Sequence, residues 1–477
     1  MTEAEAIDPV GGSTAAPEPA NPQKNPSLTE GPVRPQLLKL TAFMALGIVA
    51  SLITTLADTY FVSRLGTHEL AAMTFTFPVV LLIISIAIGF GTGVVSVISR
   101  TVGEGDQAGV RALGTDSIVL ATLLTACIST IGFFTIDPLF KLLGAEPEVL
   151  PLIHKYMSIW YLGTVFQIIP QIGSSVMRAH GDARTPSMLM TCTAVVNAVL
   201  DPILIFGWGP IPAMGIAGAA WAGNISRLFF IAAAAYVIQR GMHALAPLSF
   251  NMARLKASWG KLLHIALPAT ATQLVQPLAS GILTAIIASF GTSAVAAYGI
   301  ASRVEIFAFI YVMAISIALA PIVGQNAGAQ KFDRVKEAVA FSIKFCLVGG
   351  VILAVLLALV GSRLASVFAT DPDVIELATF YFYVVPISYA IGGIVAVAMS
   401  TLNAMALPFA ASMVGLARSL FISVPFVFIG LWLGGIHGVF MAISAAAVAV
   451  GLFSWWFVHR AVYKRDHDAL PVAVAAE

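Results

Sequence analysis

The sequence predicts an all-α integral membrane protein with twelve transmembrane helices in two six-helix lobes. Three observations predict this fold class. The 477-residue chain is 58% hydrophobic and only 10% charged, whereas an ordinary soluble domain has about 25% charged residues. Apolar runs of bilayer-spanning length recur along almost the whole chain. The second half of the chain also repeats local patterns of the first half.

Composition and missing motifs exclude several classes of protein. The net charge of +1 argues against a nucleic-acid partner. Cys127, Cys192 and Cys346 lie far apart in apolar runs, so neither a disulfide framework nor a metal site follows from them. The sequence has no Walker A loop, H-E-x-x-H or G-x-S-x-G motif. We therefore expect neither an enzyme nor an ATP-driven pump, and no cofactor.

The amino terminus differs in composition from the rest of the chain. Residues 1–33 are rich in Pro, Ala and Glu and contain almost no large apolar residue. Such a segment cannot bury a core, and it lacks the basic-then-apolar order of a secretory signal. We expect a disordered, dispensable tail at residues 1–35.

Runs of about 20 mostly apolar residues between polar breaks mark the expected spans. There are twelve of them: 40–62, 71–98, 114–136, 149–175, 185–208, 214–239, 262–289, 294–323, 338–361, 377–401, 409–432 and 436–458.

The distribution of Lys and Arg between the spans sets the expected orientation. If the amino terminus is cytoplasmic, most of these residues fall on the cytoplasmic side. The outer side then holds only Arg64, Lys141, Lys155 and Arg363. Both termini are therefore expected in the cytoplasm, with the protein in the plasma membrane, most simply a bacterial inner membrane.

An internal repeat divides the chain into two halves. "LGTHELAAMTF" at 65–75 matches "FGTSAVAAYGI" at 290–300, and Gly103 falls on Gly328 at the same offset. Six helices is an even number, so both halves enter the membrane in the same direction, as in parallel-repeat transporters. The expected division is a tail at 1–35, an N-lobe at 36–240, a cytoplasmic linker at 241–261, a C-lobe at 262–465 and a cytoplasmic tail at 466–477.

Two carboxylates stand out within the apolar spans. Asp58 lies late in the first span and Asp201 late in the fifth, so both are expected at one depth in the outer half of the bilayer. Asn197 precedes Asp201 by four residues and projects from the same helix face. A charge at this depth costs about 2.5 kcal/mol or more, and such acids are candidates for proton relays or ion sites. The alternative is that these side chains only join helices by hydrogen bonds.

Other polar residues could line the same lobe and contact a substrate. Each of them could equally form an ordinary interhelical hydrogen bond. The substrate-cavity candidates in the first half are Ser51, Thr54, Gln167, Gln171 and Ser174.

The chain resembles the MATE (multidrug and toxic compound extrusion) transporters over about residues 36–463. The resemblance is carried by "ADTYFVSRLGTHELAA" at 57–72, by "MRAHGDARTPSM" with "NAVLDPILIFG" at 177–207, and by "ASRVEIF…GQNAGAQ" at 301–330. It implies twelve helices in two lobes. It also implies that Asp58, Asn197 and Asp201 correspond to the cation-site residues of the N-lobe.

The second half departs from one branch of that family. The seventh span carries Gln273 and Gln276 where NorM-like members have acids, and the tenth span has no acid. The chain thus resembles the DinF-like branch, with coupling chemistry in the first half alone and Gln276 as a further substrate-cavity candidate. Arg303 and Glu305 match a family motif and are interpreted as structural anchors.

Two arginines within spans remain without an assigned role. Arg227 and Arg418 lie near the middles of the sixth and eleventh spans. The sequence suggests only that they face the bundle interior or a vestibule.

The expected function is a secondary antiporter that exports organic cations or amphiphilic toxic compounds. Proton exchange at Asp58, Asn197 and Asp201 would drive it by alternating access. A sodium ion bound by the same residues is the alternative coupling ion, because their oxygens are hard ligands. A flippase for lipids or lipid-linked precursors is the other function considered. The expected partners are small-molecule drugs and the lipid bilayer, with the protein as a monomer.

Overall fold

The computed structural model describes residues 28–241, 245–247 and 251–463, and this part of the chain is almost entirely helical. The helices of the first half are α1 (Val33–Ser63), α2 (Thr67–Glu104), α3 (Gln107–Phe134), α4 (Ile136–Leu142), α5 (Leu150–Leu162), α6 (Thr164–Ala179), α7 (Arg184–Phe206), α8 (Ile216–Tyr236) and the π-helical turn η1 (Val237–Gly241). Those of the second half are α9 (Met252–Ala288), α10 (Thr292–Ala308), α11 (Ile310–Gly328), α12 (Phe332–Phe368), α13 (Pro372–Val384), η2 (Val385–Ser388), α14 (Tyr389–Ala404), α15 (Pro408–Leu416), η3 (Ala417–Phe421) and α16 (Ser423–Tyr463).

Ten helical runs of the described chain are long and apolar enough to cross a membrane. One of them, Pro408–Val462, is non-helical at Gly434 and Gly435, so it makes two crossings. Helices α5 and α6, separated at Gly163, form the remaining crossing. The fold class of twelve helices in two lobes is thereby confirmed.

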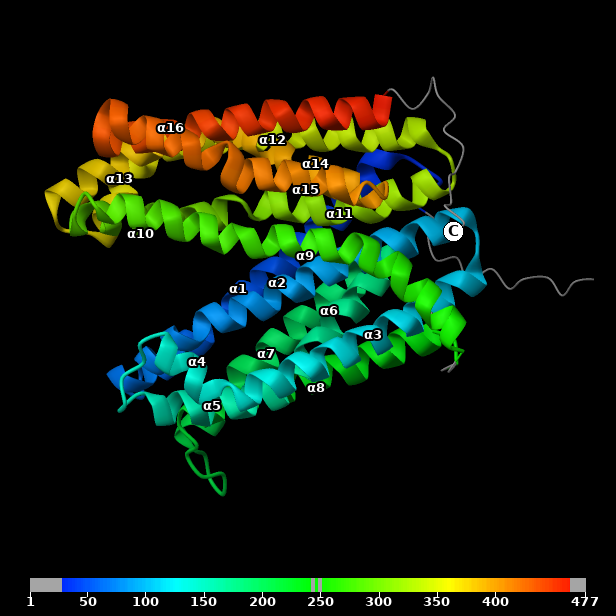
Figure 1. Cartoon of the computed structure of the whole chain (residues 1–477), viewed down its shortest axis with the longest axis horizontal. Coiled ribbons are helices and arrows are strands. Elements are labelled where there is room, and N and C mark those ends of the chain that lie inside the picture. Colours follow the sequence, from blue (N-terminus) through cyan, green and yellow to red (C-terminus); the bar gives the residue numbers. More distant parts are fainter. Residues whose placement is uncertain (1–27, 242–244, 248–250, 464–477) are drawn as a thin grey trace, which may run out of the picture.

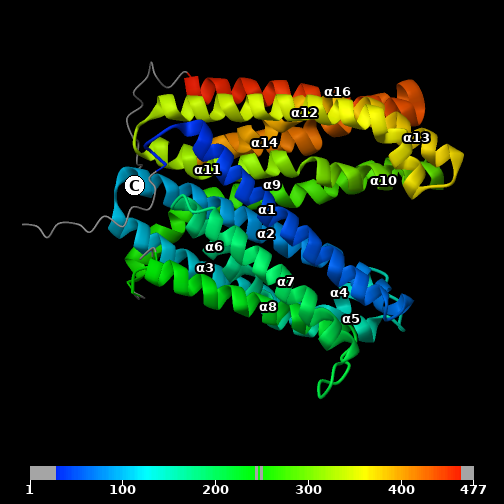
Figure 2. The same cartoon turned by 180° about the vertical axis from the view of Figure 1, so that it is seen from behind.

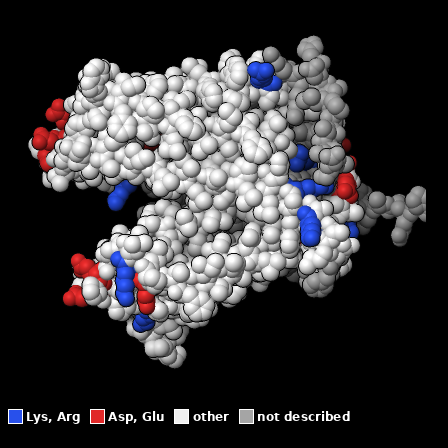
Figure 3. Space-filling model, in the orientation of Figure 1, with Lys and Arg blue, Asp and Glu red and all other residues white. Residues whose placement is uncertain are grey.

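The two lobes form a V (Figure 1). Helices α1 to α8 and α9 to α16 converge at one end, which we call the closed end, and separate at the other, the open end; the reverse view agrees (Figure 2). The space-filling view shows a cleft between the lobes at the open end (Figure 3). The described chain begins and finishes at the closed end.

The first helix of each half enters the core of the opposite lobe. The closed-end part of α1, with Val33, Leu37 and Leu40, packs into a cluster formed mainly by α11, α12 and α14. Conversely, Leu262 and Ile265 of α9 pack into the core of the first half. The lobe boundaries expected from the sequence are therefore inexact at α1 and α9, because covering an apolar face does not require a partner from the same half of the chain.

Glycines bring α2 close to the second lobe. A Cβ atom at Gly89 would overlap Thr270 of α9, and one at Gly103 would overlap the backbone of Gln325 in α11. Small residues allow such backbone approach between membrane helices. These contacts hold the closed end together.

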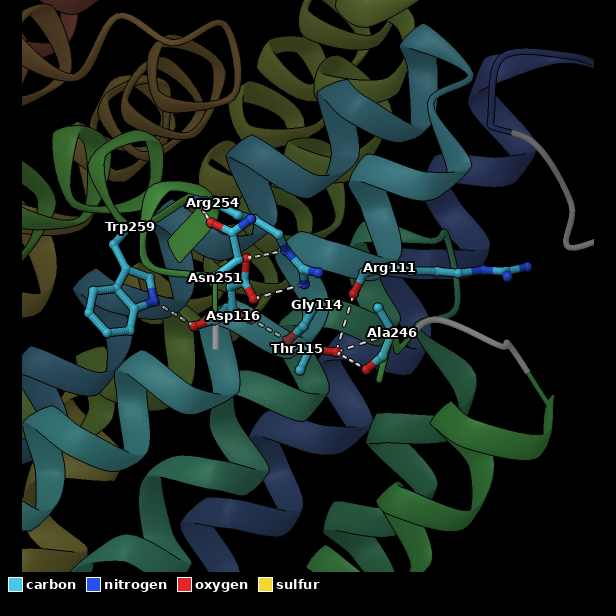
Figure 4. Close-up of polar contacts among 9 residues, drawn as sticks. Arg111, Gly114, Thr115, Asp116, Ala246, Asn251, Arg254 and Trp259 are labelled. Atoms are coloured by element: carbon cyan, nitrogen blue, oxygen red, sulfur yellow. Dashed lines mark hydrogen bonds and ion pairs between the residues drawn. The ribbon is translucent and has the colours of Figure 1, made fainter. Parts of the chain in front are cut away.

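The start of α9 is bound to α3 of the first lobe (Figure 4). Arg254 forms a two-point ion pair with Asp116, at 3.1 Å from Nη2 to Oδ1 and 3.4 Å from Nε to Oδ2. The Trp259 indole donates to the Asp116 carbonyl oxygen at 3.1 Å. Ala246 exchanges hydrogen bonds with Thr115 through its backbone N–H and C=O. The described part of the expected linker 241–261 is thus partly helical and fixed to the first lobe.

The amino-terminal boundary also differs from expectation. Helix α1 begins at Val33, and the N-terminal segment, residues 28–32, is ordered ahead of it. Leu28 is buried, its N–H donates to Gln325 Oε1 at 3.0 Å, and Arg334 donates to its carbonyl oxygen at 3.0 Å. The expectation of disorder through residue 35 is therefore wrong for residues 28–35. Residues 1–27 and 466–477 lie outside the described residues.

Candidate functional site

Asp58, Asn197 and Asp201 meet where α1 packs against α7. Each acid lies five residues before the open-end terminus of its helix, so the predicted common depth is correct. Asn197 Nδ2 donates to Asp58 Oδ1 at 2.7 Å and to Asp201 Oδ2 at 2.9 Å. One amide therefore bridges both carboxylates, which the sequence placed on separate spans.

The orientation of the Asn197 amide is fixed by α8. Ser226 donates from Oγ to Asn197 Oδ1 at 3.2 Å. The amide oxygen thus faces Ser226, and its NH2 group faces the acids. Ser226 was not predicted, because a lone serine in a helix usually bonds its own backbone and leaves no sequence signal; here it also contacts the Gly223 carbonyl oxygen.

Burial makes this cluster sensitive to charge. Asn197 is 3% exposed and Asp201 is fully buried, and Asp201 Oδ1 has no hydrogen-bond partner among the described residues. An ionised carboxylate oxygen without a partner in a buried site is costly. Because the Asn197 amide holds Asp58 close to Asp201, the two carboxylates favour the sharing of a proton, which removes one charge and supplies a donor.

Further polar groups surround the acids within the N-lobe. Arg227, one residue after Ser226, interacts electrostatically with Asp58 and with the buried Tyr156. Its Nη1 also donates to Asn224 Oδ1 at 3.3 Å, and Asn224 in turn donates to the Ile159 carbonyl oxygen at 3.0 Å. This gives Arg227, which the sequence left without a role, a place beside the acid pair. The spacing of Asn224 and Arg227, three residues apart in an apolar span, was the available signal.

The other predicted cavity residues do not join this cluster through any hydrogen bond in the described chain. Ser51 and Thr54 bond the carbonyl oxygens four residues earlier in α1, at 3.1 Å each. Ser174 is buried and cannot contact a substrate in this conformation. Gln167 keeps a buried Oε1 atom without a partner, and Gln171 is partly exposed.

In the C-lobe, Gln276 is exposed on α9. Glu305 accepts a 3.0 Å hydrogen bond from the Tyr381 hydroxyl group and so joins α10 to α13. Arg303 is exposed, and no hydrogen bond or ion pair within the described chain involves it. Its predicted anchoring role has no contact to support it.

The described residues contain no cluster of three or more His, Cys, Asp or Glu that could hold a metal ion. The Asn197 amide also presents N–H groups, and no oxygen, to the carboxylates. The carboxylate oxygens of Asp58 and Asp201 can hold a proton, and they are also the kind of hard oxygen ligand that a sodium ion needs.

The family model MatE matches residues 44–203 and 268–429, which is most of the chain. The protein belongs to the MATE family. It is therefore a multi-pass membrane transporter and no enzyme, and the family resemblance noted in the sequence is confirmed.

Two relatives indicate the range of cargo in this family. The chain is 39% identical over 433 residues to a FAD transporter of Shewanella oneidensis, covering 91% of this chain and 96% of that protein. It is 27% identical over 436 residues to the multidrug export protein MepA of Staphylococcus aureus, covering 90% and 94%.

Solved structures show the same architecture. A single-residue mutant of the MATE transporter VcmN of Vibrio cholerae superposes with a TM-score of 0.86 at 30% identity. The match covers 92% of this chain and 98% of the other. A second crystal structure of VcmN, in the bent form, gives the same TM-score.

Proposed function

We propose that this MATE transporter is a proton-driven exporter in which Asp58 and Asp201 carry the coupling proton. The observation that carries this proposal is the Asn197 bridge, which turns N–H donors toward both acids. It brings two carboxylates together in a largely buried polar cluster, so that binding one proton relieves the repulsion between them. In this proposal the closed end is cytoplasmic, the open end faces outward, and protons enter from the cleft.

For the cargo, we propose a flavin dinucleotide. The support is the 39% identity to a FAD transporter along nearly the whole chain. Export of organic cations is the second candidate, favoured by the 27% identity to MepA and by the acidic pair in the N-lobe. A flavin dinucleotide is an anion and the second candidate is a cation, so an experiment can distinguish the two.

The test uses proteoliposomes loaded with FAD or with ethidium, an organic cation. The first arm imposes an acidic exterior without sodium, and the second imposes a sodium gradient at symmetric pH. We expect FAD efflux in the first arm only, and its loss in Asp58→Asn and in Asp201→Asn. Efflux driven by the sodium gradient alone would show that sodium, and not the proton, is the coupling ion. Lipid movement without FAD efflux would favour the flippase alternative.

A further inference from the structure

Two arginines of the C-lobe are exposed at membrane depth. Arg303 comes eleven residues after Thr292, at the open end of α10, and so lies about 17 Å below that end at 1.5 Å per residue. Arg418 comes ten residues after Pro408 and lies about 15 Å from the start of α15. The hydrocarbon core is about 30 Å thick, so both positions fall within it.

An exposed arginine at such a depth requires access to water. The packed face of α10 contains Ala294, Ala297 and Ala301, and Arg303 projects from the opposite side. Exposure to lipid would cost several kcal/mol. Water at that depth is available in the cleft between the lobes, which Figure 3 shows at the open end.

The membrane-depth charges of the two lobes have opposite signs. In the C-lobe, Arg418 interacts with Glu305, which leaves the charge of Arg303 unbalanced. In the N-lobe, Arg227 interacts with Asp58, and Asn197 joins Asp58 to a second acid, Asp201, so two carboxylates accompany one arginine. An ionised N-lobe therefore attracts cations, while the C-lobe attracts an anion.

We propose that Arg303 binds the phosphate groups of the transported molecule. This inference rests on the proposed export of a flavin dinucleotide, whose diphosphate carries two negative charges. The planar guanidinium group donates parallel N–H bonds to two phosphate oxygens, which a lysine cannot reproduce. Proton and substrate would then occupy different lobes, so their coupling must pass through the relative movement of the lobes.

The experiment compares FAD with riboflavin, which has the same ring system and no phosphate. Binding of each to the full-length protein in phosphatidylcholine nanodiscs is followed by flavin fluorescence. Arg303→Gln should weaken FAD binding roughly tenfold or more, the cost of losing charge-assisted hydrogen bonds. Riboflavin binding should change less than about twofold, and Arg303→Lys should fall between the wild type and Arg303→Gln for FAD.

Arg363→Gln is the matched control, because Arg363 is also an exposed arginine of the C-lobe but lies near the open end of α12. It should bind both flavins as the wild type does. Unchanged FAD binding in Arg303→Gln, or an equal loss for FAD and riboflavin, would overturn the proposal. A third result would also overturn the proposal: Arg303→Gln binds FAD as the wild type does, but FAD binding no longer changes when phosphatidylglycerol is added to the nanodiscs. The arginine would then bind a lipid headgroup.

A separate arm distinguishes failure of this inference from failure of the proposed cargo. Inorganic pyrophosphate is titrated calorimetrically into the wild type and Arg303→Gln. Binding to the wild type alone supports the anion site even if FAD is not transported. Binding to neither protein, or equally to both, refutes it, whatever the outcome of FAD efflux.

Discussion

Asn197 donates a 2.7 Å hydrogen bond to Asp58, a residue 139 positions earlier in the chain. The bond joins α7 to α1, the helix whose closed-end part packs in the core of the other lobe. The protonation state of the acid pair thus bears directly on a helix that both lobes share. Because α1 contacts both lobes, proton binding at the acid pair can shift the equilibrium between different relative positions of the lobes.

The first prediction concerns the bridging amide. Asn197→Ala should remove both N–H donors and leave the two carboxylates in direct repulsion. We expect pH-driven efflux to fall at least about tenfold, which corresponds to the loss of one or more charge-assisted hydrogen bonds. Substrate binding should persist, since the substrate is proposed to contact the C-lobe. Efflux and binding are measured in parallel on the purified protein.

Ser117→Ala is the control for this variant. Ser117 is buried in the same lobe, and within the described part of the chain its side chain bonds only the Gly114 carbonyl oxygen of its own helix. It should transport normally. Wild-type efflux by Asn197→Ala would show that the amide bridge plays no part in coupling.

The sequence predicts this site because charge in hydrocarbon is expensive. Asp58, Asn197 and Asp201 are recognisable from their position in apolar spans alone. Ser226 and Tyr156 are not, since a serine or tyrosine is compatible with many helix positions. Arg303 is visible as a charge, but whether it anchors a helix or faces a cleft depends on tertiary packing.

The fold is predictable to a similar extent. Hydropathy gives the spans, and the repeat gives the two halves. Hydropathy does not identify which neighbour covers an apolar face, so the exchange of α1 and α9 between the cores is not visible in the sequence. Likewise, Leu28 is a single apolar residue in a polar tail, and its burial follows from backbone contacts with α11 and α12.

The second prediction concerns the ion pair between Arg254 and Asp116. The Asp116 side chain is 2% exposed and the Arg254 side chain 30%. Arg254→Ala should destabilise the protein by about 3 kcal/mol, because it leaves a buried carboxylate uncompensated. The double variant Asp116→Leu with Arg254→Met should recover much of this loss. Thermal unfolding in detergent measures both.

Lys256→Ala is the control for the ion pair, since Lys256 is an exposed residue one turn or less away on α9. Its melting temperature should match that of the wild type. If Arg254→Ala behaves like this control, the start of α9 does not depend on the ion pair for its attachment to α3.

The third prediction concerns pH and His180, which follows α6 at the closed end, outside the membrane-spanning segments. Burial lowers the pKa of His180 below its ordinary value of 6.5, opposed by its 2.8 Å contact with the Val176 carbonyl oxygen. The unfolded chain therefore binds the proton more readily than the folded protein. The contribution of His180 to the free energy of unfolding is therefore fully present above pH 6.5 and is lost as the pH falls below this value.

Melting temperatures at pH 7.5 and 5.5 test this effect in the wild type and His180→Gln. The loss on acidification should be smaller in His180→Gln. His68→Gln, which changes an exposed histidine, should retain the wild-type pH dependence. Identical pH dependence in all three proteins would contradict a lowered pKa of the partly buried His180.

The last prediction revises the expected dispensability of the amino terminus. A chain shortened to begin at Ser27 should transport and melt as the full-length protein does, since it keeps the N-terminal segment, residues 28–32. A chain beginning at Pro35 should lose about 3 kcal/mol or more, from burial of Leu28 and from several hydrogen bonds to Gln325 and Arg334. Leu28→Ala should show part of this loss. Equal melting temperatures for the two shortened chains would mean that these contacts contribute nothing, and the closed end would then rely on its helix packing alone.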